Sequence, residues 1–155
     1  MSTAHINIGS NIGDRLALIR QAVAAIERAF GVTAVCSVPY ESAPWGFDSP
    51  NRFINIGVNI ETGWLTPVKI LRRLQQVQAK IDDSSHRTAD GAYADRRIDI
   101  DIIALDDTIL GTPELTLPHP RMHQRDFVLR PMAQILPGWH HPLLHATPAE
   151  LLGRL

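Results

Sequence analysis

The sequence predicts an α+β domain in which helices cover both faces of a mostly antiparallel sheet. Segments with apolar residues at every second position, as in strands, alternate with segments whose apolar residues recur at helical spacing. They follow one another in the order βαββαβ, and further helical segments come after them. With 155 residues, 45% of them apolar, the chain can bury a substantial core. No repeat and no second domain is evident, so residues 1–155 are expected to form one domain.

The composition gives no sign of a nucleic-acid or membrane partner. The formal net charge is -1, and no apolar run approaches the ~18 residues that span a bilayer. The N-terminus lacks the basic and apolar blocks of a secretory signal. Cys36 is the single cysteine, so no disulfide can form within the chain, and Val35 and Ser37 beside it fit a buried strand position. We expect a cytoplasmic protein.

The first predicted elements are a strand, a tight turn and a helix. Residues 5–8 alternate as a short strand, and residues 9–14 lead into a helix that Gly31 ends. The expected inner face of this helix consists of Leu16, Ile19, Val23, Ile26 and Phe30. Gly9 and Gly13 in the turn could cradle a phosphate, but the turn lacks the residues of a P-loop and needs no ligand as a structural cap.

Two strands and a second helix are expected next. Residues 32–42 are predicted to form the second strand, with one face made of Val32, Ala34, Cys36 and Val38. Residues 52–62 form the third strand, whose core face consists of Ile54, Ile56, Val58 and Ile60. Thr66 and Pro67 then begin a helix, and its inner residues are Ile70, Leu71, Leu74, Val77 and Ile81.

The loop between the second and third strands holds two large aromatic residues, Trp45 and Phe47. Loops usually present polar residues to solvent. The two rings therefore either fill the core beneath the loop or form a hydrophobic wall for a flat heterocycle. On the third strand, Asn55 shares a face with Phe53, and an amide beside a ring suits recognition of the edge of a heterocycle.

The acidic strand over residues 96–105 carries the strongest functional signal. Apolar and acidic residues alternate in it, so Asp99 and Asp101 project from one face, roughly 7 Å apart. The pair is either the solvated face of a half-buried strand or a site for one or two Mg²⁺ ions. Arg96 and Arg97 at the strand's entrance favour a metal-bridged phosphate. The preceding polar residues 82–95 are either disordered or a lid, and their junction with this strand favours a lid.

After the acidic strand we expect a turn at residues 106–108 and a hairpin arm over residues 109–117. Residues 132–136, after Pro131, are predicted to form a short helix. A capping box from Thr147 to Glu150 opens the last helix, at residues 149–155. The βαββαβ order with this helical tail is the ferredoxin-like plan.

His119 and His123 have the spacing of zinc ligands on a helix, but Pro118 and Pro120 disfavour a helix there. An anion-binding role is the better interpretation of this segment. Its cationic residues are His119, Arg121, Arg125 and Arg130, and the apolar residues 127–129 anchor them in the core.

Five motifs in order along nearly the whole chain resemble those of a known family. They are residues 7–11, 42–46, 53–55, 96–101 and 117–127. The sequence is similar to the 6-hydroxymethyl-7,8-dihydropterin pyrophosphokinases of folate biosynthesis. This resemblance implies transfer of pyrophosphate from ATP to the hydroxymethyl group of the pterin, with release of AMP and with two Mg²⁺ ions bound.

The resemblance also implies roles for individual residues. The catalytic residues are Asp99, Asp101, Arg96 and Arg87, and the two aspartates are the metal ligands. The nucleotide contacts are Gln75, Gln78, Arg96, Ile102, His119 and Arg125. The pterin pocket consists of Ser42, Ala43, Pro44, Trp45, Gly46, Phe53, Asn55, Tyr93 and Phe127. In this arrangement the pterin ring stacks between Phe127 and either Phe53 or Trp45.

The sequence departs from the family pattern mainly around the lid. Gln78 stands where a glutamate is common, and Pro120 replaces a frequent tyrosine. The lid is some three residues longer, with Arg87 in place of paired arginines and Tyr93 as a substitute for the usual tryptophan. The lid departures leave one alternative to the pyrophosphokinase open, a non-catalytic pterin-binding paralogue. A second alternative rests on the aspartate pair itself: a metal-dependent phosphatase or nucleotide hydrolase.

Overall fold

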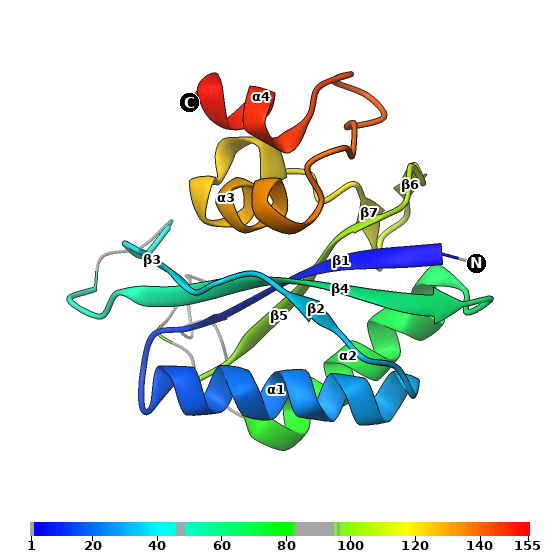
Figure 1. Ribbon diagram of the computed structural model, residues 1–155. Helices are drawn as coiled ribbons and strands as arrows, with labels where there is room; N and C mark the ends of the chain where they lie inside the picture. The colour runs from blue at the N-terminus through cyan, green and yellow to red at the C-terminus, as the bar shows by residue number, and fades with distance from the viewer. Residues whose placement is uncertain (1, 46–48, 83–94, 96) are drawn as a thin grey trace.

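The computed structural model describes residues 2–45, 49–82, 95 and 97–155. A five-stranded sheet lies between helices α1 (Arg15–Phe30) and α2 (Pro67–Ile81) on one face and α3 (Asp126–Ile135) and α4 (Pro148–Gly153) on the other (Figure 1). Every strand pair in the described residues is antiparallel. The predicted α+β class, with helices on both faces of the sheet, is confirmed. In the described part of the chain, no helix is long and apolar enough to cross a membrane.

The central strand of the sheet is β1 (Ser2–Ser10), which pairs with β4 (Phe53–Gly63) on one side and with β5 (Asp99–Leu105) on the other. Side chains alternate between its two faces. Ile6 and Ile8 are buried against α1 and α2. His5 and Asn7 face the α3 layer, where both take part in hydrogen bonds. The sheet thus has an aliphatic face and a face with polar residues, and helices cover both.

The strand predicted over residues 32–42 is interrupted. The structure has two short strands there, β2 (Val35–Cys36) and β3 (Tyr40–Ser42), and both pair with β4. Between them, the Ser37 hydroxyl accepts a hydrogen bond from the Gly57 N–H (2.9 Å), and Pro39 has no N–H to give to a ladder. Polar side chains and a proline therefore replace regular pairing at this point.

Cys36 is exposed, so the prediction of a buried strand position for it is wrong. Its strand β2 lies at the edge of the sheet, and Val35 and Val38 beside it are also exposed, by 57% and 52%. Desolvation of its partly covered thiol and the negative charge of Glu27 raise the pKa of Cys36. The thiol is therefore mostly protonated, and hence weakly nucleophilic, at neutral pH.

The boundaries of α1 are set by residues at its two ends. The Asp14 side chain accepts a hydrogen bond from the Ala17 N–H (3.2 Å), and Gly31 ends the helix in the left-handed conformation with φ 65°. Leu16 was expected on the inner face but is 37% exposed, because the face that meets the sheet is rotated from the predicted one toward Leu18 and Ala22. The buried residues of α1 are Leu18, Ile19, Ala22 and Ile26.

Helix α2 agrees with its prediction. Thr66 accepts a hydrogen bond from the Lys69 N–H (3.4 Å) as its N-cap, and Pro67 is the first helical residue. Ile70, Leu74 and Val77 are buried in the core that α1 and α2 form with the sheet.

Helix α3 begins earlier than predicted. It was expected to start after Pro131 but starts at Asp126 and includes this proline. Pro131 has no N–H for the carbonyl of Phe127, four residues before it. That carbonyl accepts a hydrogen bond from the Asn7 side chain of β1 instead (3.0 Å). A long-range contact thus compensates for the proline.

The remaining C-terminal elements are short. Strands β6 (Leu110–Gly111) and β7 (Thr116–Leu117) form the predicted hairpin arm, and a 3-10 turn, η1 (Met122–Gln124), precedes α3. The capping box between Thr147 and Glu150 is present at the start of α4, which ends at Gly153 rather than at residue 155.

The buried apolar residues form two clusters, one on each face of the sheet. Strand β5 contributes to both by alternation, and its register against β1 shifts after residue 102. As a result, Ile103 and Ala104 both belong to the cluster under α3 and α4. Asp99 and Asp101 precede this irregularity and keep the regular alternation of a strand.

Candidate active site

Four strands meet at the end of the sheet that lies at the left of Figure 1. Strands β1 and β3 end there, and β4 and β5 begin there. The register places Gly9 between Asn55 and Asp99, and Ser42 beside Phe53. Most of the described residues for which a binding or catalytic role was predicted lie on these strand ends or on the segments that adjoin them.

Asp99 and Asp101 are half-buried and lie on the face of β5 that looks toward α3. Ile100 between them is buried in the core of the opposite face. Their neighbours on β1 are Gly9 and Asn7, respectively. The two carboxylates therefore share one face of β5, as the alternation of the sequence predicts, and lie side by side at this end of the sheet.

A buried amide and an aromatic ring lie next to this acidic pair. A Cβ atom at Gly9 would come within 2.8 Å of Asn55 Oδ1 and 3.4 Å of Phe53 Cδ1, so only glycine leaves room for these two side chains. Asn55 is 2% exposed, and its Nδ2 donates a hydrogen bond to Ser42 Oγ (2.8 Å). This bond fixes the plane of the amide, which can then offer a defined edge to a ligand.

Cationic side chains approach the same end of the sheet from the α3 layer. The Arg125 guanidinium carbon lies 4.3 Å from the ring centroid of Trp45 and 5.6 Å from that of Phe127. Arg121 lies 5.5 Å from the centroid of Trp45. Such cation–π contacts hold a guanidinium without neutralising its charge. The two aromatic residues predicted to bind a flat ring therefore border a guanidinium here.

His119 connects this cationic region to the acidic strand. The backbone N–H of His119 donates to the Ile103 carbonyl of β5 (2.8 Å). The ring Nδ1 of His119 accepts a hydrogen bond from the backbone N–H of Arg121 (3.2 Å). Burial, and then the positive charge of Arg125, lower the pKa of His119 to about 4, although Asp99 acts in the opposite direction. At neutral pH the ring is uncharged, and its proton is on Nε2.

Two side chains from the end of α2 hold the outer edge of β5. Gln78 Oε1 accepts a hydrogen bond from the Ile100 N–H (2.8 Å). Asp82 Oδ2 accepts from the N–H groups of Arg97 (2.9 Å) and Ile98 (3.4 Å). The peptide between the two aspartates is thus fixed from both sides, by β1 and by α2. Gln78 was predicted as a nucleotide contact, and no role had been predicted for Asp82.

A second group of contacts, around Asp95, is not evident from the sequence. The Asp95 carboxylate accepts hydrogen bonds from the amide groups of Asn11 (2.7 Å) and Asn51 (2.8 Å). These residues join the end of β1, the segment before β4 and the segment before β5. Polar side chains in adjoining segments were the only available signal, and such residues are common in loops.

The other predicted site residues fall into three groups. Gln75 and Ala43 are exposed, and Pro44 is half-buried. Ile102 is buried in the core on the face opposite to the aspartates, so its side chain is not in the site. The remaining four lie outside the described residues: Gly46, Arg87, Tyr93 and Arg96.

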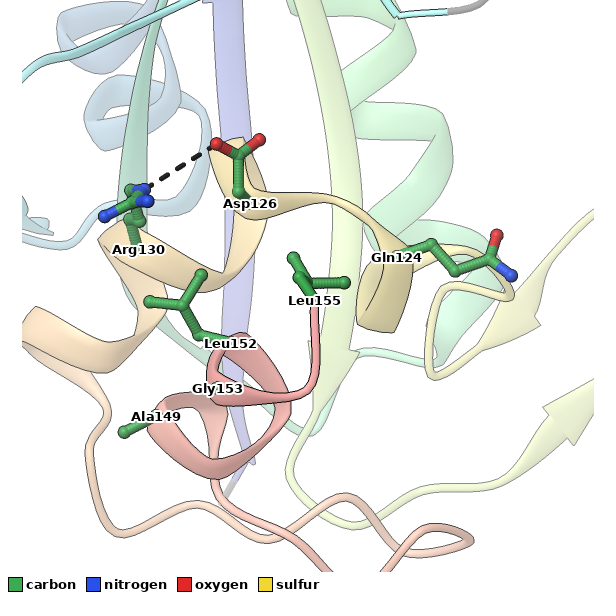
Figure 2. Close-up of a pocket in the computed structure, with 7 residues that line it drawn as sticks. All are labelled: Gln124, Asp126, Arg130, Ala149, Leu152, Gly153 and Leu155. Atoms are coloured by element: carbon green, nitrogen blue, oxygen red, sulfur yellow. Dashed lines mark ion pairs between the residues drawn. The ribbon is translucent and has the colours of Figure 1, made fainter.

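Arg130, expected in the cationic cluster, belongs to a different surface. Its Nε lies 3.6 Å from Asp126 Oδ2, one turn away on α3. Figure 2 shows this ion pair beside a hollow of about 600 Å³ between α3 and the end of α4. The hollow is also lined by Leu152 and Leu155, and none of the predicted catalytic residues lines it.

The donor set of the acidic pair suits Mg²⁺. Both side chains offer carboxylate oxygens, which hard divalent cations prefer. Within the described ranges, no group of three or more histidine, cysteine or acidic side chains is arranged to hold a metal ion. Mg²⁺ commonly takes only one or two carboxylates and completes its coordination with water and substrate phosphates. A pair of aspartates beside cationic residues fits that mode of binding.

The sequence matches an established family over most of its length. The pattern of the 7,8-dihydro-6-hydroxymethylpterin-pyrophosphokinase (HPPK) family covers residues 5–137. The 2-amino-4-hydroxy-6-hydroxymethyldihydropteridine pyrophosphokinase of Porphyromonas gingivalis is 38% identical over 144 residues, which are 92% of this chain and 95% of that protein. The protein of the same name from Bacillus subtilis is 40% identical over 134 residues, 85% of this chain and 77% of its own length.

Solved structures show the same fold in longer chains. The HPPK-DHPS of Plasmodium falciparum matches 99% of this chain with a TM-score of 0.73 and 13% identity. An HPPK-DHPS crystallised with substrates also matches with a TM-score of 0.73, at 12% identity. This chain spans 44% and 43% of those chains, respectively, less than half of each. At this level of identity the likeness concerns the fold alone. The sequence match decides the family: the chain belongs to the 7,8-dihydro-6-hydroxymethylpterin-pyrophosphokinase family.

Proposed function

We propose that the chain transfers pyrophosphate from ATP to the hydroxymethyl group of 6-hydroxymethyl-7,8-dihydropterin, giving the pterin diphosphate and AMP, in folate biosynthesis. The observation that carries this proposal is the position of Asp99 and Asp101. In the sheet, only Gly9 separates Asp99 from the buried residue Asn55, and His119 lies near enough to Asp99 and to Arg125 to interact electrostatically with both. Residues 1–155 act as one domain and, by the same proposal, as a cytoplasmic monomer.

The pterin is assigned to the space beside Asn55. A pterin presents donors and acceptors along one edge, and the amide of Asn55, oriented by Ser42, can pair with such an edge. Phe53, Trp45 and Phe127 supply aromatic surfaces for the ring faces. Ala43, Pro44, Gly46 and Tyr93 complete the proposed pocket.

The triphosphate is assigned to the cationic side of the acidic pair. Arg125 can exchange its contacts with the aromatic rings for phosphate oxygens, which bind guanidinium groups more strongly. His119 is neutral at pH 7, and its Nε2–H can donate a hydrogen bond to a phosphate oxygen. Arg87 and Arg96 are proposed to add charge near the phosphates, and Gln75 and Gln78 to lie near the nucleotide.

The reaction forms a bond between the hydroxymethyl oxygen and the β-phosphorus. The bond from that phosphorus to the oxygen of the α-phosphate breaks, so AMP leaves with the electron pair and the hydroxyl proton passes to solvent. Asp99 and Asp101 are proposed to hold two Mg²⁺ ions, which when bound neutralise phosphate charge and favour ionisation of the acceptor hydroxyl. The protein's own task is to align acceptor and phosphate, which by itself accounts for a large part of such catalysis.

The reaction can be tested by measuring AMP from ATP with and without Mg²⁺ and the hydroxymethylpterin. We expect AMP only when both are present. Binding of the pterin without turnover would indicate a non-catalytic paralogue. Release of inorganic phosphate in the absence of pterin would indicate a phosphatase. Either result would overturn the proposed transfer.

Substitution of the acidic pair gives the sharper test. Asp101→Asn and Asp99→Asn each keep the side-chain volume but remove a charge, so AMP formation should fall by about 100-fold or more. Asp106→Asn is the matched control, because Asp106 is exposed beyond the other end of β5 and has a positive φ of 49° that asparagine tolerates. The control should keep the parent rate. Unchanged rates in the first two variants would remove the basis of the metal assignment.

A further inference from the structure

The carbonyl of Phe127 lies inside helix α3 but has no hydrogen-bond donor at the usual position within that helix. Within α3 it should accept a hydrogen bond from the N–H four residues later. That residue is Pro131, which has no N–H. The carbonyl is therefore available for a partner outside the helix, at the residue whose ring is proposed to stack on the pterin.

Asn7 of β1 provides this partner. Its Nδ2 donates to the Phe127 carbonyl at 3.0 Å, and the residue is only 5% exposed. In the sheet, Asn7 stands between Gly57 on β4 and Asp101 on β5. The donor that fixes Phe127 is thus the immediate cross-strand neighbour of a carboxylate of the acidic pair.

The surrounding contacts keep α3 close to the sheet at this point. A Cβ atom at Gly57 would lie 2.9 Å from Cβ of Pro131, so only glycine lets the helix approach so closely. At the far end of the helix, Asn59 donates from its Nδ2 to the Ile135 carbonyl (3.0 Å). Two asparagines of the sheet therefore hold two carbonyl groups of α3, one near the site and one remote from it.

We propose that Asn7 is a positioning residue that sets the distance of the Phe127 ring from the acidic strand. Asn7 acts through the backbone of Phe127 and not on the substrate, and Pro131 makes this possible by leaving the carbonyl for it. The inference rests on the proposed function, in which Phe127 binds the pterin. If Asn7 acts in this way, its hydrogen bond to the Phe127 carbonyl affects binding of the pterin and not binding of the triphosphate.

The first test is Asn7→Ala. We expect the KM for the hydroxymethylpterin to rise about tenfold, because the loss of a buried hydrogen bond is commonly worth a factor of that order. The kcat and the KM for ATP should change by less than about twofold, since the acidic pair and the cationic residues remain. An unchanged pterin KM would overturn the proposal.

The second test asks whether the effect passes through the Phe127 carbonyl. In Pro131→Ala, residue 131 regains an N–H that can serve this carbonyl within the helix. The double variant Asn7→Ala/Pro131→Ala should therefore recover a pterin KM within about twofold of Pro131→Ala alone. A pterin KM as high in the double variant as in Asn7→Ala would show that Asn7 acts by another route.

Asn59→Ala is the matched control for general loosening of α3. It removes the hydrogen bond to the Ile135 carbonyl and also the acceptor of the buried His5 ring, so it should lower the urea midpoint at least as much as Asn7→Ala, with no rise in the pterin KM. A comparable rise in the pterin KM in this control would mean that Asn7 has no special role.

Failure of the proposed function would be distinguishable from failure of this inference. If the parent chain makes no AMP, the function is wrong, but the coupling between Asn7 and Pro131 can still be measured in urea unfolding. Asn7→Ala should lower the urea midpoint with proline at position 131 and should have little effect with alanine there. Equal losses in both backgrounds would overturn the structural part of the inference.

Discussion

Among single residues, His5 has an ionisation that should affect stability, because its ring is buried. It is fully buried on β1, and its Nδ1 lies 2.7 Å from Asn59 Oδ1. Asn59 donates from its Nδ2 to Ile135, so Oδ1 is the acceptor and the His5 proton is on Nδ1. Its Nε2 has no hydrogen-bond partner among the described residues. Burial lowers the pKa of His5 to about 4, so the folded protein holds the ring neutral.

This predicts a loss of stability in acid. In the unfolded chain His5 binds its proton near pH 6.5, whereas in the folded chain it does so only near pH 4. The stabilising contribution of neutral His5 is therefore complete above pH 6.5 and is lost as the pH falls toward 4. The contribution of His5 is at most about 3 kcal/mol. His5→Gln should reduce the slope of unfolding free energy against pH in this window, as measured by urea titrations at several pH values. His119 and His141, whose pKa values are also lowered, contribute to the slope that remains. An unaltered slope in the variant would contradict the assignment.

At the level of elements, the edge of β5 depends on the last turn of α2. Strand β5 lies at one edge of the sheet, so its outer N–H groups have no strand partner in the described structure. Asp82 and Gln78 replace a neighbouring strand here. Their side chains accept hydrogen bonds from the N–H groups of Arg97, Ile98 and Ile100. The helix thereby fixes the backbone on which the acidic pair is mounted.

Asp82→Ala should therefore loosen the entrance of β5. We expect a loss of about 1–3 kcal/mol in unfolding free energy, because the buried N–H of Ile98 and the partly buried N–H of Arg97 lose their acceptor. Amide hydrogen exchange should accelerate at Arg97 and Ile98, while the Ile100 N–H remains protected by Gln78. Asp82→Asn, which keeps an acceptor oxygen, is the control and should show a smaller effect. Equal exchange at Ile98 in the parent and in Asp82→Ala would refute this account.

The elements that the sequence predicted well are those whose signal is local. Alternation defines the aliphatic face of β4 and the acidic face of β5, and capping residues define the starts of α2 and α4. The errors arise where distant residues decide. Judged locally, a proline disfavours a helix, so Pro131 was expected to lie outside one. Asn7 on β1 compensates by donating a hydrogen bond to the Phe127 carbonyl, which Pro131 cannot serve. Likewise, the break between β2 and β3 depends on the bond between Ser37 and Gly57.

For the whole molecule, the candidate site could be predicted only in part from the sequence. The motif residues Asp99, Asn55 and His119 do converge at one end of the sheet, as expected from the resemblance. The contacts that hold the site together could not be predicted. Asp95 joins Asn11 and Asn51 across 84 and 44 positions of the chain, and no local pattern distinguishes these residues from ordinary loop residues.

Because the site is assembled from both layers, ligands should stabilise the entire fold. A nucleotide that binds only the folded state, at about 100 times its Kd, adds about 2.7 kcal/mol. For a chain of this size we expect the Tm to rise by about 5–10 °C with a non-hydrolysable ATP analogue and Mg²⁺. Asp101→Asn, or chelation of the metal, should abolish most of this rise, because the aspartates are proposed to bind the nucleotide through the metal. The rise caused by the pterin alone should persist in Asp101→Asn, since Asn55 and the aromatic residues remain. A nucleotide-induced rise of equal size with and without Mg²⁺ would place the triphosphate away from the acidic pair.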